Sequence, residues 1–392
     1  MTRAHNRPDG GKVDVQIKEV VALKDLEVFV RFPHNLYQGH PYWVPALDSD
    51  EKNTLRHDRN PAFDHCDARY WLAYLDGRIA GRVAAIRNRL DIEKRGQPYL
   101  RFGWIDFVDD QGVSQALLGA VEEWAENLGM TAVHGPLGFT DLDREGMLVE
   151  GFDEIATLST THNYPYYGDH MARLGYEKDV DWLEHEIALP AELDQRVARV
   201  AATAMRRLDV RLLEVRSRRE LLPYAAELFD VLNAEYRHLY GVVPLTQTQV
   251  DAYVKQYFGF IHPDFVPVVL DRHGQMIAFT IAMPSLSRAL QKAKGRLFPL
   301  GFAHLLSSIN KNDRVDLYIG AVRSEYQGWG VNAIMMQRMF DACRRHGIKT
   351  IHANPQLETN RRVLNQWKYF QARQHKRRRV FIKHLAPGAS TA

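Results

Sequence analysis

The chain has little cysteine and no long apolar run. Its two cysteines, Cys66 and Cys343, are far apart in the sequence, which excludes a disulfide framework and indicates a reducing compartment. No apolar stretch approaches the roughly 18 residues that a membrane span requires, and the first residues lack the apolar core of a secretory signal. Membrane-spanning, disulfide-rich secreted, collagen-like and largely disordered classes are therefore excluded, and we expect a cytoplasmic protein.

Several motifs of common chemistries are also missing. The sequence contains no HExxH, no CxxC pair, no Gly-x-Ser-x-Gly and no Walker loop. Metalloprotease, redox, serine-hydrolase and nucleotide-triphosphatase functions therefore have no support from motifs, and we predict no metal site.

Acidic residues are scarce in the last part of the chain. Residues 285–392 hold 20 Lys/Arg and 5 Asp/Glu, whereas residues 1–284 hold 31 Lys/Arg and 43 Asp/Glu. The net charge of the whole chain, +3, hides this difference. A basic segment of this kind is either a solvated face or the binding side for an anionic partner. Such a partner is a phosphorylated cofactor, an anionic membrane or a nucleic acid.

The same order of elements occurs twice in the 392 residues. Apolar alternation around Asp76-Gly77 predicts a β-hairpin, and a second hairpin is predicted around the turn at 271–274. Each hairpin is followed by a strand, a helix, a strand, a short helix and a last strand. We predict an α+β fold, a mixed sheet with flanking helices, used twice. The predicted organisation is a disordered tail at 1–12, a first domain at 13–189, a linking helix at 190–209, a second domain at 210–385 with an insertion at 285–312, and a tail at 386–392.

A glycine-containing loop in the second copy carries the most information about chemistry. A strand runs into Gln327-Gly328-Trp329-Gly330-Val331-Asn332, and an apolar helix follows at once. Glycines allow close approach of a ligand to the backbone, and the free N–H groups of a first helical turn attract anions such as a pyrophosphate. A tight strand-to-helix turn explains the same glycines without a ligand.

The order hairpin, strand, glycine loop, helix, strand, Asn, helix resembles the GNAT superfamily of acyl-CoA N-acyltransferases. That family's phosphate loop reads Gln/Arg-x-x-Gly-x-Gly/Ala, and Gln327, Gly330 and Asn332 take these places here. Asn332 departs from the pattern. Asn360 matches the asparagine that often follows the fifth strand of the family. The resemblance covers nearly the whole chain as a tandem pair, and it is closer in the second domain than in the first.

The resemblance implies two tandem GNAT-like domains and acyl-CoA as the donor, without a metal. It places the pantetheine of CoA against one strand and the phosphates on the glycine loop. The residues it assigns to the cofactor are Ala321, Val322, Arg323, Gln327, Gly328, Trp329, Gly330, Val331, Asn332, Ala333 and Asn360. In the first domain Asp109 and Asp110 stand where a pyrophosphate would lie, so we expect that domain to keep the fold without the cofactor.

The implied reaction is attack of a neutral amine on the thioester, which needs a base and often an acid for the thiolate. The family's usual acid is a tyrosine seven residues after the asparagine, but that position is Trp367 here. Tyr369, two residues further on, is the alternative acid. The candidate bases are Glu358, His352, Asp316 and Tyr318. An ordinary structural role also explains each of these residues taken singly.

The insertion at 285–312 combines five Lys/Arg and no acidic residue with many apolar residues. This composition is typical of an interfacial amphipathic element or a lid over an apolar channel, or the apolar groups pack on the first domain. Together with the phrases at 295–299, 35–37 and 41–45, it resembles the YghO-like branch of tandem GNAT proteins, members of which have been linked to bacterial ceramide synthesis.

Three functions are consistent with these observations. The first is transfer of a fatty acyl group to the amine of an amphipathic, sphingoid-base-like acceptor, with the protein held peripherally on the inner face of the membrane through 285–312. The second is acyl or aminoacyl transfer to a small polar amine. The third is a non-catalytic CoA-binding module. We expect no nucleic-acid partner, because the coiled-coil arm of the tRNA-dependent tandem enzymes is not visible in the sequence.

Overall fold

The computed structural model describes residues 14–297 and 301–386. The predicted tail at 1–12, part of the predicted tail at 386–392, and Phe298 of the insertion lie outside the described residues. Of Tyr369 only the backbone is described. Within the described residues, no helix combines the length and the apolar character needed to cross a membrane.

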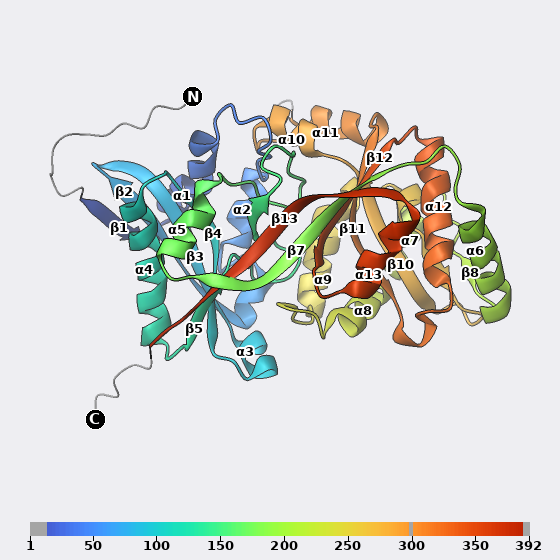
Figure 1. Cartoon of the computed structure of the whole chain (residues 1–392), viewed down its shortest axis with the longest axis horizontal. Coiled ribbons are helices and arrows are strands. Elements are labelled where there is room, and N and C mark those ends of the chain that lie inside the picture. The colour runs from blue at the N-terminus through green and yellow to red at the C-terminus, as the bar shows by residue number, and fades with distance from the viewer. Residues whose placement is uncertain (1–13, 298–300, 387–392) are drawn as a thin grey trace.

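The first half of the chain alternates strands and helices as predicted (Figure 1). Its elements are β1 (Val15–Glu19), α1 (Leu23–Leu36), α2 (Asp48–Thr54), the 3₁₀ helix η1 (Pro61–Asp64), β2 (Cys66–Leu75), β3 (Arg78–Asn88), α3 (Arg89–Arg95), β4 (Tyr99–Phe107), α4 (Gln111–Asn127), β5 (Ala132–Gly135), β6 (Met147–Glu150), α5 (Tyr166–Arg173) and β7 (Glu177–Ala188).

The second half begins with a linking helix and repeats the pattern. Its elements are α6 (Gln195–Leu208), β8 (Arg211–Leu212), α7 (Arg218–Leu221), η2 (Leu222–Tyr224), α8 (Ala225–Tyr236), α9 (Gln247–Tyr257), η3 (Phe258–Phe260), η4 (Pro263–Phe265), β9 (Val268–Leu270), β10 (Met276–Pro284), α10 (Ser287–Ala293), α11 (Gly301–Asn310), β11 (Arg314–Val322), η5 (Ser324–Tyr326), α12 (Val331–Arg345), β12 (Thr350–Leu357), α13 (Arg361–Asn365), η6 (Gln366–Tyr369) and β13 (Gln371–His384).

Both predicted hairpins are present. β2 pairs antiparallel with β3 around Asp76-Gly77, and β9 pairs antiparallel with β10 around the turn at 271–274. Pro223 lies in η2, which separates α7 from α8. The α+β class with a mixed sheet and flanking helices is confirmed.

All strands of the described chain form one sheet with an exchange of strands at its centre. The order is β1-β2-β3-β4-β5-β13-β7-β12-β11-β10-β9-β8, and β6 lies against β13. β7 ends the first half in sequence, yet it pairs with β12 of the second half. β13, the last strand of the chain, pairs with β5 of the first half. Figure 1 shows β7 and β13 side by side across the middle of the molecule.

Helices cover both faces of the sheet, so the strands are buried on both sides. In the first half α1 and α4 pack on opposite faces, each burying its own apolar cluster. In the second half α8 packs on one face, and α6 together with α12 packs on the other. β3 and β10 are mostly apolar, as is typical of a sheet with two covered faces, whereas the long β7 and β13 carry many charged residues.

Candidate active site

The centre of the second half is a gap between two parallel strands. β11 and β12 pair only where residues 314–317 face residues 350–353. Beyond that point β11 continues to Val322 and β12 to Leu357, and within the described residues neither strand has a partner on the side of the gap. The two central strands therefore splay apart beyond residues 317 and 353.

The glycine loop lies at the open end of this gap. Gly328 and Gly330 have φ values of +81° and +90°, which favour glycine. Gly330 is the N-cap of α12, so the N–H groups of Val331 and Asn332 begin the helix without intrahelical acceptors. Their direction and the helix dipole suit a phosphate at this position.

One cavity of about 1670 Å³ joins the glycine loop to the gap between the strands. Most of the residues that the resemblance assigned to the cofactor line it, and the structure brings them together around the loop. These are Ala321, Val322, Gln327, Gly328, Gly330, Val331, Asn332, Ala333 and Asn360.

The other two assigned residues are outside the cavity lining. Arg323 donates a hydrogen bond from Nε to the Met276 carbonyl, 2.8 Å away. Trp329 is 47% exposed, and the guanidinium of Arg207 lies over its ring at 4.5 Å. Both side chains therefore have contacts that account for them without a ligand.

Gln327 fixes the start of the loop through its side chain. Its Nε2 donates to the Val322 carbonyl at 2.9 Å and to Glu235 Oε2 at 3.1 Å. Its Oε1 accepts a hydrogen bond from Arg362 at 3.1 Å. Three elements, β11, α8 and α13, are thereby tied to the first residue of the loop.

Of the predicted acid and base residues whose side chains are described, only Tyr318 lines the cavity. Burial, aided by the charge of Asp316, raises the pKa of Tyr318 well above its usual range. The hydroxyl is therefore protonated at neutral pH. It can donate a proton, and it is a poor base.

The remaining candidates lie elsewhere. Asp316 and His352 are buried behind the gap, with Asp316 Oδ1 4.0 Å from His352 Nδ1. Glu358 is ion-paired with Lys178 at 2.8 Å and also accepts a backbone hydrogen bond. Trp367, at the position of the family's tyrosine, lines the cavity and donates from Nε1 to Gln356 Oε1 at 2.8 Å.

The cavity extends from the gap into the first half, where carboxylates line it. Asp141 and Asp143 stand on the loop after β5, and burial raises the pKa of each to about 6. Asp143 accepts hydrogen bonds from the N–H groups of Phe139 and Thr140 at 2.8 and 3.1 Å. Our sequence analysis did not single out this loop, because nothing local shows that it faces the other half of the chain.

Asp141 and Tyr236 both line the cavity. The Tyr236 hydroxyl donates to the Gly320 carbonyl on β11 at 3.0 Å. Burial raises the pKa of Tyr236 to about 12, and the charge of Asp141 adds to that rise.

The rest of the cavity wall is apolar and comes largely from the helices over the second half of the sheet. The polar glycine loop and this apolar compartment are parts of one space. The apolar lining residues include Leu221, Leu228, Phe229, Val254, Phe258, Ile261, Ile281, Ile319, Met335 and Met339.

The equivalent positions of the first half carry acidic side chains with partners inside the chain. The Asp110 side chain caps α4 by accepting a hydrogen bond from the Val113 N–H at 3.1 Å, and Asp109 Oδ1 lies 3.0 Å from His170 Nε2. Beside β4 the chain itself fills the gap, since the Leu137 N–H donates to the Phe102 carbonyl at 2.7 Å. A carboxylate therefore occupies the α4 N-terminus, whereas the corresponding N-terminus of α12 has no side-chain cap.

The insertion packs mainly on the first half. Leu286, Leu290 and Leu305 form a buried cluster with Val44 and Leu47. The insertion also contacts the early segment that contributed to the resemblance to the YghO-like branch, because Gln291 Nε2 donates to the carbonyls of Pro41 and Trp43 at 2.8 and 2.9 Å. Phe302 and Leu306 differ from this cluster, being 49% and 44% exposed.

No family model matches the sequence, but similar proteins are known. The chain is 29% identical over 382 residues to Protein YghO of Escherichia coli, covering 94% of this chain and 95% of that protein. It is 26% identical over 305 residues to the bacterial ceramide synthase of Caulobacter vibrioides, covering 76% of this chain and 77% of that protein.

Solved structures share the fold at low sequence identity. A tandem GNAT protein from the clavulanic acid biosynthesis pathway has a TM-score of 0.55 at 12% identity, covering 96% of this chain and all of that chain. The chain therefore has the tandem GNAT fold, and the resemblance to the YghO-like branch is confirmed.

Proposed function

We propose that this protein is an acyl-CoA-dependent N-acyltransferase, and that it transfers a fatty acyl group to the amine of an amphipathic acceptor similar to a sphingoid base. The observation that carries the proposal is the single cavity of about 1670 Å³ that begins at the α12 N-terminus and passes the gap between β11 and β12. The similarity of the chain to a bacterial ceramide synthase supports a lipid acceptor.

The phosphates of CoA would lie on the N-terminus of α12 and the pantetheine along the open stretch of β11. The acyl chain would occupy the apolar compartment that continues from there under α8 and α9. A typical small-molecule pocket has about 300–1,000 Å³. The larger cavity here favours a long chain over an acetyl group.

The acceptor would approach from the first half, where Asp141 lines the cavity. A carboxylate whose pKa burial raises to about 6 is ionised at pH 7 and basic enough to help deprotonate an ammonium. The free amine then attacks the thioester carbonyl, the C–S bond breaks, and the thiolate takes a proton. Tyr318, protonated and in the cavity wall, is the donor we propose for that proton.

The insertion would hold the enzyme at an anionic membrane surface, where its lipid substrates are found. Its basic residues Arg288, Lys292, Lys294, Arg296 and Lys311 are all exposed. α10 and α11, which carry or flank them, lie side by side (Figure 1). Each Lys or Arg near an anionic leaflet contributes about 1 kcal/mol, and the exposed Phe302 and Leu306 can enter the headgroup layer.

The test is a comparison of donors and acceptors by mass spectrometry of the amide product. We expect a higher kcat/KM with palmitoyl-CoA and a C18 sphingoid base than with acetyl-CoA and a small polyamine. Ala225→Phe, in the cavity wall, should lower kcat/KM for palmitoyl-CoA more than for acetyl-CoA. Ala226→Phe, on the exposed side of the same helix, is the matched control.

Two results would favour the other functions. Equal or better turnover of acetyl-CoA with a soluble amine would indicate a small polar acceptor. Binding of CoA without turnover of any amine would indicate a non-catalytic module. Asn332 and Trp367, which depart from the family pattern, are consistent with that function.

A further inference from the structure

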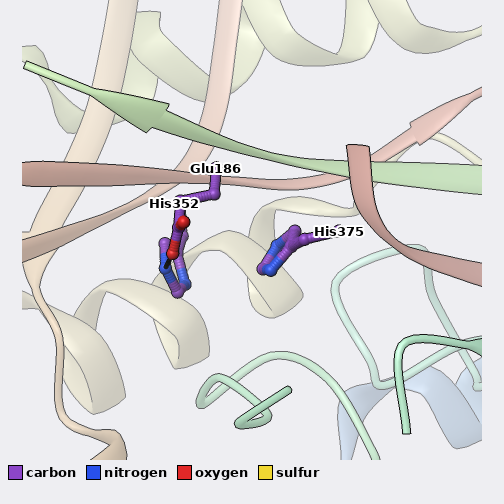
Figure 2. A group of neighbouring side chains, drawn as sticks. All are labelled: Glu186, His352 and His375. Carbon is purple, nitrogen blue, oxygen red and sulfur yellow. Dashed lines mark hydrogen bonds and ion pairs between the residues drawn. The ribbon is translucent and has the colours of Figure 1, made fainter. Parts of the chain in front are cut away.

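Three side chains with metal-ligand chemistry converge where the two halves exchange strands (Figure 2). Glu186 comes from β7, His352 from β12 and His375 from β13, and one ligand atom of each lies within 4.8 Å of the other two. Glu186 Oε2 is 3.0 Å from His352 Nε2, and the two imidazole rings are 4.9 Å apart between centroids.

The register of the strands produces this arrangement. His352 and Glu186 are directly opposite each other in the β12–β7 ladder, so their side chains share one face of the sheet. In β13 the register shifts between Gln374 and Lys376, which makes His375 the extra residue of a bulge. A bulge re-aims a side chain, and Figure 2 shows the His375 ring extending toward His352.

Both histidines are in the protonation state that binds metals. The side chains of His352 and His375 are 2% and 0% exposed, and burial lowers the pKa of each imidazole to about 3. They are therefore neutral at pH 7, as metal ligands are. The Nε2 of His375 is buried and has no hydrogen-bond partner among the described residues.

A further carboxylate lies near each imidazole, and Glu154 shares the Arg373 guanidinium with Glu186. Glu154 Oε2 is 3.4 Å from His375 Nδ1, and Asp316 Oδ1 is 4.0 Å from His352 Nδ1. A histidine that ligates a metal usually gives its other N–H to a carboxylate, which fixes the ring and strengthens the ligand. Glu154 is placed to do this for His375, whereas the 4.0 Å between Asp316 and His352 exceeds a hydrogen bond.

The third ligand is held in place as well. Arg373 donates from Nε to Glu186 Oε1 at 2.9 Å, which leaves Oε2 facing His352. The Glu186 carboxylate would therefore bind an ion through one oxygen. The positive charge of Arg373 also lies on the solvent side, since its side chain is 54% exposed.

We propose that Glu186, His352 and His375 bind one divalent transition-metal ion of the zinc class. Two imidazoles and one carboxylate suit Zn²⁺ better than Mg²⁺ or Ca²⁺, which prefer all-oxygen sites. Ligand atoms of a tetrahedral zinc site are about 3.4 Å apart, so small side-chain rotations close the site. None of the three residues lines the substrate cavity. The ion therefore joins β7, β12 and β13 and takes no part in acyl transfer.

The first experiment uses the wild-type protein, treated with EDTA and dialysed. Titration with Zn²⁺ alone should give one bound ion per chain by elemental analysis, and the midpoint of thermal unfolding should rise. Co²⁺ in place of Zn²⁺ should give the visible absorption of a four-coordinate site. Absence of bound metal above background, with an unchanged unfolding midpoint, would overturn the proposal.

Variants locate the ion. His375→Ala should lose the stoichiometric ion, and His375→Cys should restore it with a thiolate-to-cobalt band. His262→Ala is the matched control, because His262, Asp264 and His346 form a second, more exposed cluster. Loss of the ion in His262→Ala with retention in His375→Ala would overturn the proposal.

CoA binding provides a check that each variant is folded. A protein without acyl-transfer activity that still binds one Zn²⁺ would overturn only the proposed function.

Discussion

At the scale of single residues, burial gives one carboxylate of the cavity the properties of a base. Asp141 lines the cavity, and its pKa is raised to about 6 because burial penalises its charged form. Its neighbour Asp143 has a similarly raised pKa, but two backbone N–H groups hold its carboxylate. The two residues therefore differ in what they can do, although their types and surroundings are alike.

We expect Asp141→Asn to lower kcat by about 10²-fold or more, the usual contribution of a general base, with CoA affinity unchanged. In the wild type, kcat/KM should rise with pH up to about 6 and then level off, as the base must be ionised. Steady-state kinetics over this range and calorimetry with CoA are the measurements. Asp143→Asn is the control, and an equal loss of kcat in both variants would argue against Asp141.

The same substitution should not lower the stability of the protein, although it lowers the activity. A carboxyl whose pKa is raised on folding costs stability as the pH rises from its ordinary value to about 6. Asparagine removes that cost, so Asp141→Asn should unfold at the same or a higher temperature than the wild type at pH 8. A marked fall in the unfolding temperature would mean that lost activity reflects a damaged fold.

Some site residues were predictable from the sequence and others were not. The loop from Gln327 to Ala333 was predictable, because the glycines, the helix start and the anion site are contiguous in sequence. Asp141 and the partners of His352 were not, since they come from the other half of the chain. Their proximity depends on the pairing of strands more than a hundred residues apart.

At the scale of elements, corresponding helices of the two halves begin in opposite ways. α12 begins at Gly330 with no side-chain cap, whereas Asp110 caps α4. A bound anion can therefore complete the first turn of α12 but not that of α4. We infer that the chain binds one CoA, in its second half.

Asn332→Asp tests this inference without disturbing the fold. A negative charge on the first turn stabilises a helix by about 0.3–1 kcal/mol, so the unfolding temperature should not fall. The same charge repels phosphates, and we expect CoA affinity to drop by about 10-fold or more. Isothermal calorimetry measures affinity and stoichiometry, and two CoA molecules per wild-type chain would contradict the inference.

Gly330 is less suitable for this test. A Cβ there would lie 2.9 Å from Val200 of α6. Substitution at Gly330 would therefore alter helix packing as well as the site.

The insertion is the second element with a testable role. Because Phe302 and Leu306 are exposed and do not line the cavity, the double change to Ser should weaken binding to anionic vesicles. Retained CoA affinity and retained preference for long acyl-CoA are expected. Co-sedimentation with phosphatidylglycerol vesicles at low and high salt measures the effect. Equal binding to neutral vesicles, unaffected by salt, would contradict the electrostatic part of this model.

Short sequence motifs predicted the helices and strands better than they predicted which elements contact one another. Asp76-Gly77 specifies a hairpin within a few residues, and the structure has it. The apolar residues of the insertion left a packing role and an interfacial role open, because helical spacing does not say what covers a face. The structure shows Leu286 and Leu290 packed in a buried cluster and Phe302 and Leu306 exposed, and the interfacial role stays a proposal.

At the scale of the whole molecule, the exchanged strands make the two halves depend on each other. β7 lies between β12 and β13, and β13 also completes the first half through β5. Sequence repeats predicted two similar units but gave no sign of this exchange, because each terminal strand is compatible with its own half. The domain limits at 189 and 210 stay a prediction about the order of elements along the chain.

This interdependence predicts the behaviour of a nicked protein. The chain between β7 and α6, residues 189–194, has no helix or strand, so a protease site inserted there should be cleaved in the folded protein. We expect the two fragments to co-elute as one species on gel filtration and to bind CoA, because the β7–β13 and β7–β12 ladders cross the cut. The fragment ending at 189, expressed alone, lacks β13 beside β5 and should aggregate through its open edge. If the cleaved fragments separate without denaturant and each remains soluble and folded, the halves are independent domains and the exchanged strands do not hold them together.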